Sequence, residues 1–141
     1  MPLRLERASI EVRTPSRVVV VNVTSQVRGA VSRAGLRHGM AVASVPHTTC
    51  SLLVNEDEAG LKDDLVRLVT RLLEPLAGDE PFHHDRIDNN ARAHLMASLL
   101  GHAVTLPVAE GDLGLGTWQS LFLLEMDGPR RRRLDLLFVG D

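Results

Sequence analysis

The feature that most limits the fold is a series of short apolar segments, several with a two-residue period, separated by turn residues. Residues 3–13 alternate between apolar and polar side chains, and residues 18–23 are almost all valine. A two-residue period is typical of a strand with one covered face, and a short β-branched run is typical of a strand covered on both faces. We expect further strands at residues 40–45, 52–55, 102–108, 113–125 and 130–139.

Three other segments have apolar residues at helical spacing. Thr24 or Ser25 is suited to cap the first and Asn90 to cap the third, because short polar side chains accept hydrogen bonds from free N–H groups at a helix start. The second follows the acidic run 55–58, where the helix dipole favours carboxylates. We expect helices over 24–34, from the acidic run until Pro75 and Gly78, and over 90–100, with Leu61, Leu65, Leu68, Val69 and Leu72 as the buried stripe of the second.

Together these segments predict one domain over residues 1–141. We expect an α+β fold: a mostly antiparallel β-sandwich of about seven strands with two to three helices. A chain of 141 residues with 44% hydrophobic content can bury roughly 70% of the surface that it exposes when unfolded.

Composition excludes several classes of function. The net charge is only −2 and aromatic residues make up 3%, so we expect no nucleic-acid partner. No stretch approaches 18 uninterrupted apolar residues, and the first residues lack an apolar signal core, so we expect no membrane partner and a cytoplasmic location. Cys50 is the sole cysteine, which excludes an internal disulfide and a four-cysteine zinc site.

The densest polar stretch runs from His83 to His94 and brings together imidazoles, carboxylates and carboxamides. Its first part reads as an irregular loop and its second part as the start of the third helix. Unpaired N–H groups and the positive end of the dipole at a helix start favour an anion, and the loop side chains are also of the metal-ligating kind. A solvated, capped loop would explain any one of these residues but not the whole cluster.

Two further polar groups interrupt the apolar chain. One follows Pro46 at a strand end and comprises His47, Thr48, Thr49, Cys50 and Ser51, with Asn55 shortly after. The other is Gly116-Thr117-Trp118-Gln119, with Glu125 six residues further on. Strand ends and glycine-interrupted strands are places where rigid elements present side chains to a ligand.

These motifs closely resemble those of the YjbQ-like family, often called secondary thiamine-phosphate synthases. The resemblance rests on His47-Thr48-Thr49 followed by Asn55-Glu56, on the run from Asp88 to His94, and on Gly116 to Gln119, and it extends from about residue 5 to 139. It implies a cytoplasmic homotrimer of small α+β sandwiches, with sheets packed about a threefold axis and a weak ability to make thiamine phosphate.

The resemblance also implies a set of site residues. Either His83 or His84 fills the family's second histidine position, and its adjacency to Asp85 favours His84. Cys50 is interpreted as a small buried thiol and not as a nucleophile. The expected catalytic residues are His47, His84, Asp85, His94 and Glu125, and the expected substrate-binding residues are Thr48, Thr49, Asn55, Asp88, Asn89, Trp118 and Gln119.

Two chemistries remain open for this site. Neutral imidazoles of His47, His84 and His94 would form a three-histidine site for a divalent metal (zinc, manganese or magnesium) with an open position. Without a metal, histidine and helix-start N–H groups would bind a phosphate, with Glu125 or Asp85 as general base.

Three functions follow. The first is a transferase that joins a pyrimidine pyrophosphate to a thiazole phosphate. The second is a trimeric protein that binds a divalent metal or a small phosphorylated metabolite and has only incidental synthase activity. The third is a purely structural trimer.

Two features have competing interpretations. Trp118 either stabilises a cationic ring through its π face or packs in the core or a trimer contact. The arginines 130–133 are expected to alternate on an edge strand, solvated or paired with acids across a subunit boundary, with a phosphate contact by one of them as the alternative.

Overall fold

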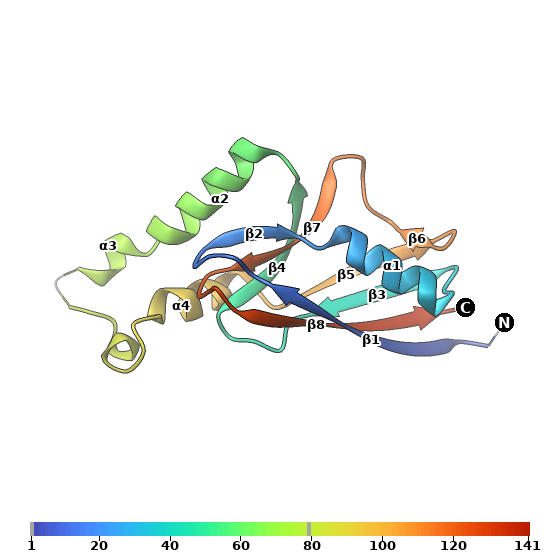
Figure 1. Cartoon of the computed structure of the whole chain (residues 1–141), viewed down its shortest axis with the longest axis horizontal. Coiled ribbons are helices and arrows are strands. Elements are labelled where there is room, and N and C mark those ends of the chain that lie inside the picture. Colours follow the sequence, from blue (N-terminus) through green and yellow to red (C-terminus); the bar gives the residue numbers. More distant parts are fainter. Residues whose placement is uncertain (1, 79) are drawn as a thin grey trace.

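The chain forms two antiparallel sheets with its helices gathered mainly at one end (Figure 1). The computed structural model describes residues 2–78 and 80–141. Over these residues the larger sheet has the strand order β1-β8-β3-β5-β6 and the smaller has the order β2-β7-β4. The strands are β1 (Arg4–Arg13), β2 (Val19–Asn22), β3 (Gly39–Ser44), β4 (Cys50–Glu56), β5 (Ala103–Ala109), β6 (Asp112–Leu113), β7 (Gln119–Glu125) and β8 (Arg131–Gly140). The expected α+β class is confirmed.

The long pairing of β1 with β8 fixes which side chains face inward. Their ten residue pairs run without interruption from Arg4 and Gly140 to Arg13 and Arg131. Because successive side chains of a strand point to opposite faces, one parity of β8 is buried. These buried residues are Arg132, Leu134, Leu136 and Phe138.

The main core lies between the two sheets and beneath α1 (Thr24–Ala34), which packs against β1, β6 and β7. Val27 and Val31 of α1 are fully buried, as are Leu123 of the smaller sheet and Phe138 of the larger. Aliphatic side chains therefore supply nearly all of this core, as the composition predicts.

A second, smaller core joins the remaining helices to the smaller sheet. These helices are α2 (Ala59–Arg71), α3 (Glu74–Ala77), the 3-10 turn η1 (His83–Arg86) and α4 (Ala91–Leu100). Its buried members from α2, α4 and the end of β7 are Val69, Ala93, Met96, Leu124 and Met126. This packing holds the start of α4 beside the end of β7. No helix in the described ranges is long and apolar enough to cross a membrane.

The expected buried stripe of α2 is wrong in part. Leu68 and Leu72 are 49% and 47% exposed, and Val69 is the buried residue of the helix. The reason is that α2 packs against β2, the edge strand of the smaller sheet, and so has only a narrow surface to cover. The helix also ends earlier than predicted, because Pro75 lies inside the separate helix α3.

The expected caps of α1 and α4 are also wrong. The Thr24 hydroxyl accepts a hydrogen bond from the Leu121 N–H at 2.8 Å, so it ties α1 to β7 and does not cap the helix. Asn90 occupies the N-cap position of α4 but makes no cap bond. Instead, Asp85 Oδ1 accepts a hydrogen bond from the Ala91 N–H at 2.9 Å. A carboxylate from the preceding turn therefore supplies the cap.

The long strand predicted over 113–125 is two strands, β6 and β7, in different sheets. Gly114 permits the change of sheet, since a Cβ there would lie 2.6 Å from Pro107 Cγ and its N–H donates to the Pro107 carbonyl at 2.7 Å. The prediction that 130–139 is an edge strand is likewise wrong, because β8 lies between β1 and β3.

Candidate functional site

A pocket of about 380 Å³ opens where the loop before β4, the start of α4 and the turn between β7 and β8 meet. Five of the predicted site residues share it: His47, Thr48, Thr49, Asp88 and His94. We call it the histidine pocket. Its lining residues are Pro46, His47, Thr48, Thr49, Asp88, Asn90, His94, Asp127, Arg130 and Arg132.

His47 is held by the backbone of β8. Its Nε2 accepts a hydrogen bond from the Arg133 N–H at 2.8 Å, beyond the point where β3 stops pairing with β8. Burial, followed by the nearby Arg132 guanidinium, lowers the pKa of His47 below its ordinary value of 6.5. A neutral ring that accepts through Nε2 carries its proton on Nδ1. His47 therefore holds its proton on Nδ1 at neutral pH.

An enclosed ion pair lies behind the pocket. The side chains of Arg132 and Glu125 are only 4% and 0% exposed, and Arg132 Nε donates to Glu125 Oε1 at 2.8 Å. Thr14 Oγ1 donates to the same carboxylate at 2.7 Å. Burial alone would raise the pKa of Glu125, but the hydrogen bonds from Arg132 and Thr14 outweigh it and hold the pKa below 4.5. Glu125 is thus an ionised counter-ion, enclosed behind the pocket and not among its lining residues.

Arg132 connects this ion pair to the pocket wall. Its Nη2 donates to Thr49 Oγ1 at 2.8 Å, which fixes the orientation of a threonine that is itself buried. Thr48 lies next to it in the lining and is exposed. The two predicted threonines therefore differ: Thr49 is tied to the buried network, and Thr48 is open to solvent.

Arg130 and Asp127, from the turn between β7 and β8, form another part of the lining. Arg130 donates to the Asp127 carbonyl at 2.8 Å and to Asp127 Oδ2 at 3.1 Å, and Asn90 Nδ2 donates to the same carboxylate oxygen at 3.0 Å. Burial alone would raise the pKa of Asp127, but the hydrogen bonds from Asn90 and Arg130 have the larger effect. The pKa of Asp127 is therefore lowered. The lining as a whole carries two carboxylates, Asp88 and Asp127, and two guanidiniums. It offers both donors and acceptors to a ligand.

His94 lines the histidine pocket, and His84 lies against His94 outside the lining residues. The rings of His84 and His94 meet edge to face, with centroids 4.6 Å apart and planes at 76°. His83 points elsewhere, with its Nε2 3.3 Å from Glu80 Oε1. Of the two candidates, His84 is the one that contacts a pocket residue.

The expected metal ligands do not form a compact set within the described residues. There, no three His, Cys, Asp or Glu side chains gather as a metal site requires. His84 and His94 are neighbours, but the Nε2 of His47 is already bonded to the Arg133 N–H. Within the described residues of one chain, His47, His84 and His94 are therefore not arranged as a three-histidine metal site.

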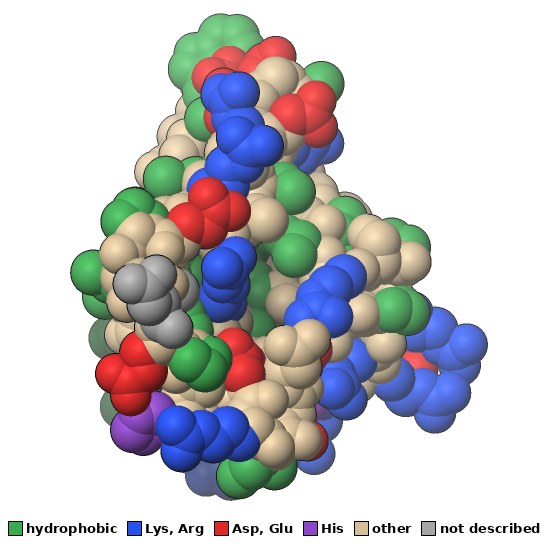
Figure 2. All heavy atoms as spheres, turned by 90° about the vertical axis from the view of Figure 1, so that its left-hand side faces the viewer, with side chains coloured by type: hydrophobic (Ala, Val, Ile, Leu, Met, Phe, Trp, Pro, Cys, Tyr) green, Lys and Arg blue, Asp and Glu red, His purple; other side chains and the backbone are tan. Residues whose placement is uncertain are grey.

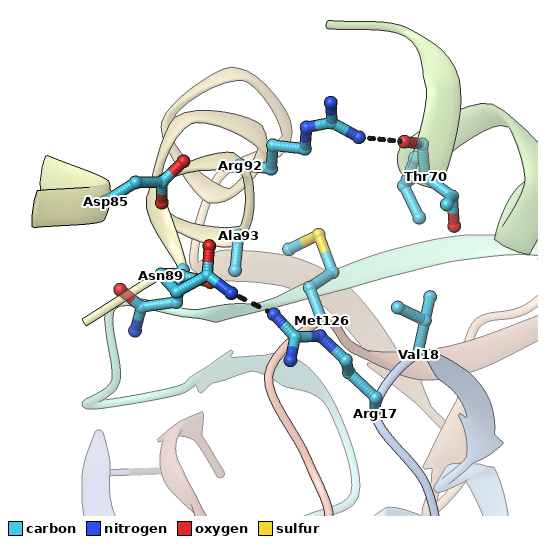
Figure 3. Close-up of a pocket in the computed structure, with 10 residues that line it drawn as sticks. Arg17, Val18, Thr70, Asp85, Asn89, Arg92, Ala93 and Met126 are labelled. Carbon is cyan, nitrogen blue, oxygen red and sulfur yellow. Dashed lines mark hydrogen bonds between the residues drawn. The ribbon is translucent and has the colours of Figure 1, made fainter. Parts of the chain in front are cut away.

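Asp85 and Asn89 face a different cavity of about 290 Å³ between the start of β2, α2 and α4 (Figure 3). We call it the arginine pocket because Arg17 and Arg92 lie on opposite sides of it. Asn90 lines both pockets. The full lining is Arg17, Val18, Val69, Thr70, Asp85, Asn89, Asn90, Arg92, Ala93 and Met126.

Trp118, Gln119 and Asn55 lie at the far end of the smaller sheet. The register pairs Cys50 with Glu125 at the histidine-pocket end and Glu56 with Gln119 at the other. Six residues of strand separate the two ends, which is roughly 20 Å. Trp118 is 74% exposed, so it is not a core aromatic. This third group does not meet the other two within one chain.

Sequence reasoning missed the inward position of Arg132. It assigned the four arginines to an edge strand, although Arg132 has the same parity as the buried Leu134 and Leu136. The two-residue alternation of the strand could therefore have predicted that Arg132 faces inward. Thr14 carried no comparable signal, because its partner Glu125 lies more than 100 positions away in the sequence. The bond between Asp127 and Asn90 likewise joins residues more than 30 positions apart.

Two antiparallel sheets, a buried Arg–Glu pair linking them and a polar pocket at one end define the class: a small α+β sandwich with a loop-built binding site. The chain belongs to the UPF0047 protein YjbQ-like family, whose sequence profile matches residues 8–141. The resemblance seen in the sequence motifs is thereby confirmed.

Individual relatives agree over nearly the whole chain. A UPF0047 protein of Archaeoglobus fulgidus is 42% identical over 89% of this chain and 94% of its own length. A YbjQ-like protein of unknown function from Sulfolobus solfataricus has a TM-score of 0.92 and 35% identity, covering 99% of this chain and 100% of that one. A hypothetical protein from Aeropyrum pernix has a TM-score of 0.90 and 40% identity, covering 96% and 99%.

Proposed function

We propose that the histidine pocket binds a small phosphorylated metabolite and supports a weak transfer of the thiamine-phosphate synthase type. The observation that carries the proposal is that polar residues from separate parts of the sequence line the same pocket. His47, Asp88, His94 and Arg130 come from three separate segments and line one pocket, and the backbone of β8 and a buried ion pair fix its rear wall. Such supported side chains are typical of a binding site.

The pocket offers groups suited to both ends of such a substrate. Arg130 and Thr48 are exposed donors for phosphate oxygens, and Asp88 is an acceptor for an amino group. In the proposed reaction, the bond from the pyrimidine methylene carbon to pyrophosphate breaks as the thiazole nitrogen bonds to that carbon, and pyrophosphate leaves with the electron pair. Positive groups of the pocket would stabilise the departing charge.

The alternative is a metabolite-binding or metal-binding protein whose synthase activity is incidental. Turnover separates the two: a rate of about 1 per second or more would identify an ordinary enzyme, and much slower turnover with tight binding would identify a binding protein. Elemental analysis of protein purified without chelator, before and after incubation with zinc or manganese, tests the metal.

Binding is tested with inorganic pyrophosphate by calorimetry. We expect His94→Ala to weaken binding and abolish any synthase turnover, since His94 lines the pocket. His83→Ala is the matched control, because His83 is exposed and faces Glu80. Unchanged binding and turnover in His94→Ala would overturn the proposal.

We also propose that the protein is a homotrimer whose copies cover the outer face of the larger sheet. The register places Leu5, Val139, Met40 and Pro107 in one row across four strands. Leu5 and Met40 are 61% and 45% exposed. Copies packed in this way would also allow Trp118 and Gln119 of one subunit to approach the histidine pocket of another.

Light scattering tests the assembly. We expect three times the mass of the chain for the wild type, and a monomer for Met40→Glu, because a carboxylate would be buried in an apolar contact. A monomeric wild type would overturn the trimer. Mixing inactive His94→Ala with inactive Trp118→Ala tests the shared site, since mixed trimers should regain activity.

A further inference from the structure

The arginine pocket is a second cavity, and Asn90 is the residue that it shares with the histidine pocket. Figure 2 shows a hollow at this end of the molecule, with hydrophobic side chains inside it and Lys or Arg side chains beside it. Its apolar members are Val18, Val69, Ala93 and Met126. All four belong to the second core or pack against it, so the bottom of the cavity is a fixed apolar surface.

Two guanidiniums border this apolar surface. Arg17 Nη2 donates to the Asn89 carbonyl at 3.1 Å, and Arg92 Nη1 donates to the Thr70 carbonyl at 3.3 Å (Figure 3). Arg92 also lies 3.9 Å from Glu74, and Arg17 takes part in no ion pair among the described residues. Since a guanidinium has five N–H donors, each arginine keeps donors for a ligand.

Asp85 gives the cavity one acidic side. Its Oδ1 caps α4 through the Ala91 N–H, and Oδ2 makes no hydrogen bond within the part of the chain described. The carboxylate is half-buried and held by the helix that it caps. It is therefore a positioned acceptor for an N–H or O–H of a ligand, opposed to the cationic groups.

We propose that the arginine pocket binds a small amphipathic acid, phosphorylated or carboxylated. The guanidiniums of Arg17 and Arg92 hold its acidic group. Val69 and Met126 cover its apolar body, and Asp85 accepts a hydrogen bond from its polar substituent. A cavity of about 290 Å³ restricts the ligand to a small molecule. The inference does not depend on the chemistry of the histidine pocket.

The test is a calorimetric titration with phenyl phosphate, benzoate and inorganic phosphate. We expect phenyl phosphate or benzoate to bind about tenfold more tightly than inorganic phosphate, because a ring gains contact with the apolar surface. Whichever of the two acids binds more tightly identifies the acid class. Equal binding of all three would overturn the proposal.

Variants locate the binding. Arg17→Gln and Arg92→Gln should each weaken binding of the preferred acid about tenfold, since each removes a charge-assisted hydrogen bond. Both side chains are exposed, so folding should be retained, and thermal unfolding checks this. Arg71→Gln is the matched control, because Arg71 is an exposed arginine of α2 outside the cavity. Binding that survives both variants but is lost in Arg130→Gln would assign the ligand to the histidine pocket and overturn the inference.

Discussion

Glu125 of β7 and Arg132 of β8 form an ion pair that links the two sheets. Each partner is further bonded: Glu125 accepts from Thr14 and from the Asp127 N–H, and Arg132 donates to Thr49. The pair therefore joins four segments directly behind the histidine pocket. Its main physical consequence concerns stability, because the side chains of Arg132 and Glu125 are only 4% and 0% exposed.

Glu125→Gln should lower the free energy of unfolding by about 3–5 kcal/mol, since it leaves the buried guanidinium without a counter-charge. Urea denaturation measures this. Glu11→Gln is the comparison, because Glu11 pairs with Arg13 and Arg131 at the surface, and its loss should cost less than about 1 kcal/mol. Similar effects of the two substitutions would show that the buried pair has no special role.

Stability should decrease in acid in two steps. As the pH falls through 6.5, unfolded His47 binds a proton before folded His47 does, because the folded pKa is lowered. Below pH 4.5, Glu125 is protonated in the unfolded chain while it remains ionised in the folded protein, because its folded pKa is lowered. Further stability is therefore lost. Free energies of unfolding between pH 8 and 3 measure both steps. His47→Gln should flatten the upper step, whereas removal of the exposed His102 should leave it in place.

Cys50 should be inert in the folded protein. Burial raises the pKa of its thiol to about 11, so the reactive thiolate is scarce at pH 8. A colorimetric disulfide reagent should label one thiol per chain in guanidinium chloride and almost none under native conditions. Rapid labelling of the folded chain would mean that the smaller sheet opens locally.

Asp85→Ala should destabilise the protein by about 1 kcal/mol, because it removes the cap of α4. Asp88→Ala is the control, since Asp88 is exposed and makes no cap bond to this helix. Thermal unfolding of both variants gives the comparison. If Asp88→Ala is the more damaging substitution, the assignment of the cap is wrong.

Local patterns predicted the elements well where the pattern and the packing agree. The alternation of residues 3–13 and the helical spacing of Val27 and Val31 gave β1 and α1 nearly correctly, because each buries one face against a broad partner. The stripe of α2 failed at Leu68 and Leu72, since its partner is a single edge strand. An apolar pattern shows what a helix is able to bury and not how much surface is available.

The site was predicted as a list of residues but not as an arrangement. His47, Asp88 and His94 meet, whereas Asp85, Asn89 and Trp118 face elsewhere. The division depends on the turn η1 and on the register of β4 with β7, and that register pairs residues distant in sequence. Residue types alone carry no information on these distances.

The position of Asn90 in the walls of both pockets has a thermodynamic consequence. Its amide nitrogen donates to Asp127 in the histidine pocket, and the same residue lines the arginine pocket. A ligand that shifts this side chain from one pocket alters the other. By linkage, the factor by which the first ligand changes the affinity of the second must equal the factor in the reverse direction. The affinity of each pocket for its ligand would thus depend, through the Asn90 carboxamide, on whether the other pocket is occupied.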